Sequence, residues 1–134
     1  MSEPARHFVQ YHNPDKMREY KVGKHGFGIV TDKPFRRVNG DRVWLISRQG
    51  KPRNYEYILC ETFIADDSGP DRSGRYRYFV NGSDGKSFDP PILIDKNEEW
   101  FRRLFRVTQH FRRGLMNIRD DQVVRALSSL ASLP

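Results

Sequence analysis

Apolar and polar residues alternate along much of residues 7–80, and a period of two residues is typical of β-strands. The segment 55–65 is so dense in aromatic and aliphatic residues that both of its faces should be covered, as in an interior strand of a sheet. Polar and glycine-containing stretches separate the runs, and the longest, 66–74, predicts an exposed loop. The pattern predicts strands at residues 7–11, 27–31, 42–47, 55–65 and 75–80.

Helical spacing replaces this alternation after two prolines and a short apolar run at 92–94. Asn97 is suited to cap a helix, because Glu98 and Glu99 then complement the positive end of its dipole. Asp120 can cap a second helix. The apolar residues of this second helix recur on one face: Val123, Val124, Leu127 and Leu130.

Strands that precede helices within 134 residues indicate a single domain, residues 1–134, of the α+β class. A small curled sheet or partial β-barrel, with flanking helices packed over its open side, would bury both apolar patterns. Hydrophobic residues make up 37% of the chain, which suits one compact core.

The chain is basic, with a formal net charge of +7, and its Lys and Arg residues are spread along the sequence. A folded basic face gains affinity for a polyanion by releasing counterions from the phosphates. Nucleic acid is therefore the expected partner.

Cys60 is the only cysteine, which excludes an internal disulfide and a zinc site built from several thiolates. This composition favours a reducing cytoplasm. No apolar run reaches the roughly 18 residues of a membrane-spanning helix, and the first residues lack a signal-peptide pattern. We expect neither export nor a membrane partner, and no motif indicates a cofactor.

Four segments follow one another between residues 7 and 66: FVQYHNPDKM, FGIVTDK, NGDRVWLIS and YEYILCETFIAD. In this order they resemble the first half of an EVE-like domain of the PUA-like superfamily. The most specific matches are His12, Asn13 and Met17, then Gly40, Asp41, Val43 and Trp44.

The resemblance implies a partial barrel of about five or six strands that binds nucleic acid and draws one base, often a modified one, into a cleft. Several such domains are the sensor parts of modification-dependent restriction systems, fused to a nuclease or partnered with one. DNA is therefore favoured over RNA as the ligand.

A cleft for a base needs flat rings, donors and acceptors for the base edge, and cations for the backbone. Alternation along its strand equally allows Trp44 to be a core residue, and His12 and Asn13 could instead form a turn before Pro14. The candidates for base binding are His12, Asn13, Trp44 and Tyr57. The candidates for phosphate binding are Lys33, Arg36, Arg37 and Arg48.

Two other functions remain open beside this binding module. Asp71 after Pro70, followed by Asp84 and Lys86, resembles the elements of a metal-dependent nuclease. We expect Asp84 and Lys86 in a glycine-rich turn, 81–87, whereas nuclease chemistry needs them on a rigid strand.

No histidine has a partner at the spacing of a metal site, so we expect no bound metal and no catalysis by this chain. The third possibility is a protein interaction module, or adaptor, whose last helix docks its apolar stripe on a larger subunit.

Overall fold

The computed structural model describes residues 6–13, 27–35, 37–71, 73–112 and 114–133. The strands expected at 7–11 and 27–31 are confirmed to the residue, and those expected at 42–47, 55–65 and 75–80 form with shifted ends. The elements in chain order are β1 (His7–Tyr11), β2 (Phe27–Thr31), β3 (Arg42–Gln49), β4 (Glu56–Ile64), β5 (Asp67–Pro70), β6 (Tyr78–Gly82), β7 (Asp84–Ile94), α1 (Glu99–Val107), β8 (Met116–Ile118) and α2 (Asp121–Leu130).

The larger sheet has five strands in the order β7-β4-β3-β1-β8. Strands β1 and β3 are parallel, with Val9 beside Trp44, whereas the other neighbours are antiparallel. Strand β4 lies between β3 and β7, which confirms the interior position expected for 55–65.

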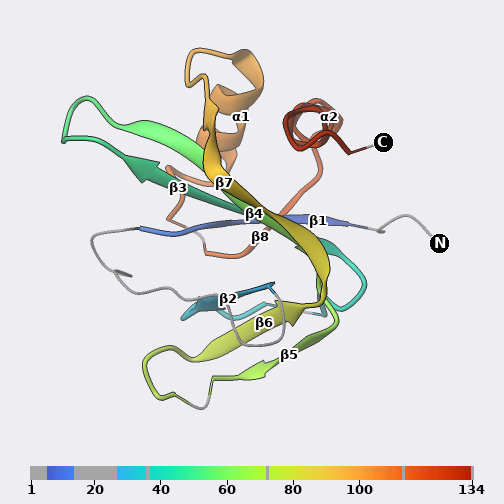
Figure 1. The fold of residues 1–134 in the computed structure, drawn as a ribbon. Coiled ribbons are helices and arrows are strands. Elements are labelled where there is room, and N and C mark those ends of the chain that lie inside the picture. The colour runs from blue at the N-terminus through green and yellow to red at the C-terminus, as the bar shows by residue number, and fades with distance from the viewer. Residues whose placement is uncertain (1–5, 14–26, 36, 72, 113, 134) are drawn as a thin grey trace.

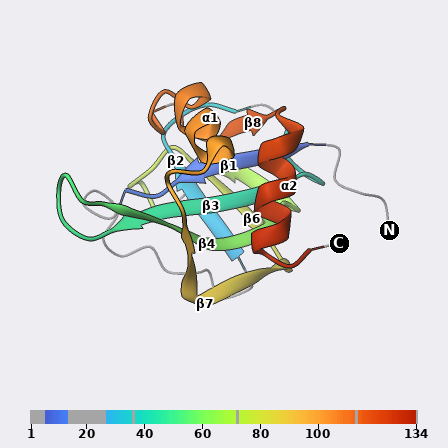
Figure 2. The same ribbon diagram turned by 90° about the horizontal axis from the view of Figure 1, so that it is seen from above.

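The molecule has three layers, with both helices on one face of the larger sheet and a small sheet on the other (Figure 1). The small sheet has three antiparallel strands in the order β2-β6-β5. The long strand β7 curves from the helix layer toward the small sheet, and α2 lies across the larger sheet when viewed from above (Figure 2).

Alternation along β3 divides its side chains between two cores. Trp44 and Ile46 are buried under the helices, where they pack with Leu104 of α1 and Leu127 of α2. The intervening residues Val43 and Leu45 are buried against the small sheet. Alternate residues of β3 therefore contribute to two different cores, one on each face of the larger sheet.

The two helices differ in how they begin. The carboxylate of Asp120 accepts a hydrogen bond from the Gln122 N–H at 2.9 Å, which confirms it as the cap of α2. The expectation for Asn97 is wrong, because Glu98 occupies the capping position of α1 without a side-chain bond. The N–H of Asn97 instead donates to Asp95 at 2.9 Å, in the turn that precedes the helix.

Two further local expectations are wrong. Residues 67–70 were expected in an exposed loop, but they pair with β6 as strand β5. Residues 84–87 were expected in a turn, but they belong to β7 and pair with β4. Pairing with a neighbouring strand outweighs the weak strand preference of Gly, Ser and Asp at both places.

The α+β class is thus confirmed, with two sheets that do not close into a barrel. Neither helix in the described part of the chain is long and apolar enough to span a membrane.

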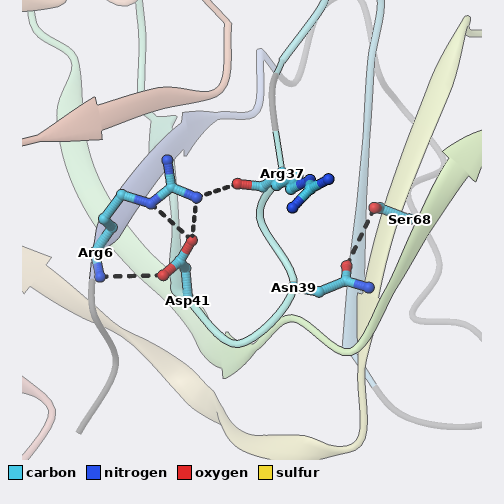
Figure 3. A network of polar contacts seen from close by, with 5 residues as sticks. All are labelled: Arg6, Arg37, Asn39, Asp41 and Ser68. Carbon is cyan, nitrogen blue, oxygen red and sulfur yellow. Dashed lines mark hydrogen bonds and ion pairs between the residues drawn. The ribbon is translucent and has the colours of Figure 1, made fainter.

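The starts of β1 and β3 are tied together by Arg6 and the buried side chain of Asp41 (Figure 3). The backbone N–H and the Nε–H of Arg6 donate to the two carboxylate oxygens at 3.1 and 3.0 Å. The same guanidinium donates to the carbonyl of Arg37, while Ser68 bonds to Asn39 on the neighbouring turn. These contacts fix the turn that leads from β2 into β3.

Candidate functional site

A cleft of about 590 Å³ opens where β1 ends, beside the last residues of β3. Its walls come from both layers, with Thr31 of β2 on the small-sheet side and Phe105 of α1 on the helix side. A cleft of this volume suits a small organic ligand. We call it the first cleft; the lining residues that concern recognition are Gln10, Tyr11, Asn13, Asp32, Lys33, Arg48, Tyr57, Phe105, His110, Phe111 and Arg112.

Aromatic rings form one wall of the first cleft. The rings of Tyr11 and Phe111 stack, with centroids 4.8 Å apart and planes 9° from parallel. Tyr57 lies against both, at 6.4 Å from Tyr11 and 5.9 Å from Phe111. Phe105 completes the group at 5.4 Å from Phe111. Such a wall offers flat faces on which a base can stack, a contact worth about 1–3 kcal/mol.

The turn after α1 places Phe111 in this wall. Gln109, His110 and Phe111 all have left-handed backbone conformations, with φ of 51°, 60° and 64°. The Phe111 N–H donates to Thr108 Oγ1 at 3.2 Å, and the His110 ring stacks on Phe105 at 4.5 Å. Each residue other than glycine that adopts the left-handed conformation costs about 1–2 kcal/mol. Strain of this kind is concentrated at functional sites.

Tyr57 brings a hydroxyl group to the same wall. Burial raises the pKa of the Tyr57 phenol above its ordinary value, and the charge of Arg48 opposes that rise. The phenol is therefore protonated at neutral pH and can donate as well as accept a hydrogen bond. The guanidinium of Arg48 lies over the ring of Tyr55 at 3.9 Å, which holds it at the edge of the first cleft.

Gln10 contributes a buried acceptor. Its side chain is only 6% exposed, and its Nε2–H donates to the Tyr11 carbonyl at 3.1 Å. That bond fixes the orientation of the amide, and Oε1 accepts no hydrogen bond from the described residues. A buried carbonyl without a donor costs about 1–3 kcal/mol, but this oxygen is itself inaccessible, so a ligand N–H could bond to it only if the side chain turned toward the first cleft.

Positive charge dominates the edge of the first cleft. Lys33 and Arg112 are exposed, and Arg48 is half-buried. Asp32 is the one carboxylate among the described lining residues, and it accepts a hydrogen bond from the Arg77 N–H at 3.1 Å. The excess of cations suits an anionic ligand.

The structure gathers four of the predicted site residues at the first cleft: Asn13 and Tyr57 for the base, and Lys33 and Arg48 for phosphate. Arg37 is exposed but lines none of the clefts described for this chain, and Arg36 lies outside the described residues, as does Met17. His12 is not among the lining residues of the first cleft, and hydrogen bonds of its backbone hold it in place. Its N–H donates to Ile46 at 2.7 Å, and its carbonyl accepts from Ser47 at 2.8 Å.

Trp44 is not a wall of the first cleft. Its side chain is completely buried in the core between the larger sheet and the helices, so neither face of the indole is accessible to a base. The indole Nε1–H is already bonded to His7. Of the two roles that alternation allowed, the structure assigns Trp44 to the core.

Sequence reasoning missed several residues of the first cleft. Tyr11 and Gln10 end a strand whose alternation was recognised, but the period of two could not show that the strand stops at a cleft. Phe111 and Arg112 follow α1 in a segment without a periodic pattern. Their residue types gave a signal, since aromatic and basic side chains outside a regular element often face a ligand.

The expectation that Asp84 and Lys86 lie in a glycine-rich turn, which spoke against a nuclease, is wrong, because both lie on a strand, β7. Lys86 and Asp71 nevertheless each bond to another residue. The Lys86 ammonium donates to the Ala131 carbonyl at 3.5 Å, and the Asp71 carboxylate bonds to the Ser73 hydroxyl at 2.6 Å.

In the described part of the chain, no group of three His, Cys, Asp or Glu side chains is placed to hold a metal ion.

Comparison of the chain with protein-family models, with curated proteins and with solved structures found no match.

Proposed function

We propose that this chain binds nucleic acid and holds one base in the first cleft. The observation that carries the proposal is the meeting of three kinds of group in one cleft: stacked rings, a protonated phenol that can donate or accept a hydrogen bond, and exposed cations. A base stacks on rings such as Phe111, its edge bonds to groups such as the Tyr57 hydroxyl, and its phosphates bind cations such as Lys33.

Two finer parts of the proposal rest on the resemblance of residues 7–66 to an EVE-like domain. The base is a modified one in DNA, and the chain is the sensor part of a restriction or defence system that acts with a nuclease in the cytoplasm. The chain then recognises its target and the nuclease cuts it.

The test is fluorescence anisotropy with labelled oligonucleotides, single- and double-stranded, that carry cytosine, methylcytosine, hydroxymethylcytosine, adenine or methyladenine. We expect one base to bind most tightly. We expect Phe111→Leu to weaken that binding about 5- to 30-fold, the equivalent of about 1–2 kcal/mol of stacking.

Arg125→Ala is the matched control, because Arg125 is an exposed cation on α2 that lines none of the described clefts. It should change affinity less than 2-fold, by roughly 0.4 kcal/mol at most. Circular dichroism shows whether each variant is folded. Absence of binding to every oligonucleotide, or equal losses in Phe111→Leu and Arg125→Ala, would overturn the proposal.

The structure leaves only part of the apolar stripe on α2 for the adaptor interpretation, because Val124 and Leu130 alone are partly exposed. Val123 and Leu127, the centre of the apolar stripe on α2, are completely buried against the larger sheet and α1. They are therefore not available to dock on another subunit.

A further inference from the structure

A second cleft, of about 380 Å³, lies beside the first. Tyr57 and Phe105 line both clefts, so the two are separated by a single layer of aromatic side chains. The other lining residues of the second cleft are Arg53, Tyr55, Lys96, Asn97, Phe101 and Arg102.

The second cleft repeats the chemistry of the first. Its rings belong to one packed group, in which Tyr57 lies 4.9 Å from Phe101 and 5.8 Å from Phe105. Arg53, Lys96 and Arg102 are exposed cations around it, and its described lining includes no carboxylate. Aromatic faces beside cations form the kind of surface on which a single strand of nucleic acid is held.

Arg48 connects the two clefts. It lines the first, and its guanidinium lies over the ring of Tyr55, which lines the second, at 3.9 Å. The Lys96 ammonium donates to the backbone carbonyl of Tyr55 at 3.0 Å. A cation at this border is placed to meet a phosphate that joins two nucleotides, one in each cleft.

The charges also favour a polymer over a single nucleotide. Six Lys and Arg residues line the two clefts together, namely Lys33, Arg48, Arg53, Lys96, Arg102 and Arg112, against the one carboxylate of Asp32. Arg53 and Arg102 form no ion pair with any described residue, so their charges face solvent. One nucleotide in the first cleft could not reach all of these cations.

We infer that the second cleft is a binding subsite for the neighbouring nucleotide of the same strand, with the joining phosphate at Arg48. This inference rests on the proposed function of the first cleft and extends it from one base to a dinucleotide. The strand would thus pass from the first cleft, between the two layers, to the second cleft beside α1.

The experiment measures affinity for deoxyoligonucleotides of one to four nucleotides that contain the preferred base, by isothermal titration calorimetry at constant ionic strength. We expect the dinucleotide to bind at least about 10-fold more tightly than the mononucleotide, as one further stacked base would provide. Arg102→Ala and Arg53→Ala should remove most of that gain and leave the mononucleotide affinity unchanged, because neither side chain lines the first cleft. Lys33→Ala should weaken all lengths.

Arg102→Ala removes an exposed side chain of α1, so it should fold as the natural chain does, and Arg125→Ala again controls for the loss of one charge. The inference is overturned if the dinucleotide gains nothing over the mononucleotide, or if the gain persists in both second-cleft variants. Failure of every length to bind would instead overturn the function proposed for the first cleft.

Discussion

The indole Nε1–H of Trp44 donates a hydrogen bond to Nδ1 of His7 at 3.0 Å, across the parallel strands β3 and β1. The two ring planes lie 16° from parallel, so the rings meet edge to edge through this bond. An imidazole nitrogen that accepts a hydrogen bond carries no proton, so the bond requires the neutral form of His7. This contact joins a fully buried indole to a half-buried imidazole at the edge of the helix-side core.

The first prediction concerns the titration of His7. Burial lowers its pKa below 6.5, and the charge of Arg42 lowers it further, while Asp41 acts in the opposite direction. A lowered pKa in the folded state means that the stability supplied by this site is present above pH 6.5 and is lost as pH falls through the lowered value. The indole N–H resonance of Trp44 in NMR spectra should shift with that midpoint.

The chain has a second tryptophan, Trp100, and the variant Trp100→Phe assigns the indole resonance without touching this pair. A titration midpoint of His7 at or above pH 6.5 would contradict the structure, because it would mean that the folded state does not disfavour the charged imidazole.

The second prediction is that Trp44→Ala damages the fold and not a ligand contact. Removal of a completely buried indole leaves a large cavity, so we expect a loss of about 3–5 kcal/mol in the free energy of unfolding. Urea denaturation measures this loss. Trp100→Ala, at a half-buried position, should cost clearly less. A Trp44→Ala protein of natural stability would show that the indole is not in the core.

Trp44 shows that the sequence was sufficient to predict a strand but not to predict which of its side chains line a cleft. Alternation predicted β1, β2 and β3 because each strand needs apolar residues on defined faces. Alternation cannot tell a covered face from a cleft wall, so Trp44 and Tyr57 looked equivalent in the sequence. Only the position of α1 shows that Tyr57 lies at a cleft and Trp44 beneath the helices.

Strands β5 and β8 could not be predicted for a different reason. DSGP and MNI have neither length nor periodicity, and they become strands because β6 and β1 offer unpaired backbone groups. Phe111 could not be assigned to the first cleft from the sequence either. Its position depends on the left-handed conformations of residues 109–111, none of which is a glycine that would indicate such a turn.

A third prediction concerns Glu61, a carboxylic acid on β4 that is 2% exposed. Burial raises its pKa from 4.5 to about 7, although the Gly28 N–H donates to the carboxylate and opposes the rise. With a raised pKa, the stability contributed by the protonated form is fully present below pH 4.5 and is lost as pH rises through 7. Glu61→Gln should therefore stabilise the fold at pH 8 relative to the natural chain.

The size of this effect should be about 1–3 kcal/mol at pH 8, and it should vanish near pH 4.5. Urea denaturation at both pH values measures it. Glu56→Gln, at an exposed position on the same strand, is the control. A Glu61→Gln protein that is less stable than the natural chain at pH 8 would mean that the buried carboxylate is stabilised by a partner.

The contact between Arg6 and Asp41 gives a fourth prediction (Figure 3). Asp41 is 3% exposed and lies 2.9 Å from the Arg6 guanidinium, which is itself partly exposed. Asp41→Ala should cost about 2–3 kcal/mol, because it breaks a partly buried ion pair and leaves the Arg6 N–H groups without their acceptor. Arg6→Ala should cost at least as much, because it leaves the buried Asp41 carboxylate without its cation. A double-mutant cycle measured by urea denaturation should show coupling above about 0.5 kcal/mol.

The last prediction uses salt to separate charge from stacking in the first cleft. For a single strand, each neutralised phosphate contributes about −0.7 to the slope of log affinity against log salt concentration. Contacts with Lys33, Arg48 and Arg112 should give a slope near −2 for a short oligonucleotide, and Lys33→Ala should make it shallower by about 0.7. Phe111→Leu should weaken binding and leave the slope unchanged, because stacking releases no counterion. Anisotropy titrations between 50 and 300 mM salt, roughly, measure both effects. A slope that Lys33→Ala does not alter would show that this cation contacts no phosphate, and the strand would then have to enter the first cleft from another side.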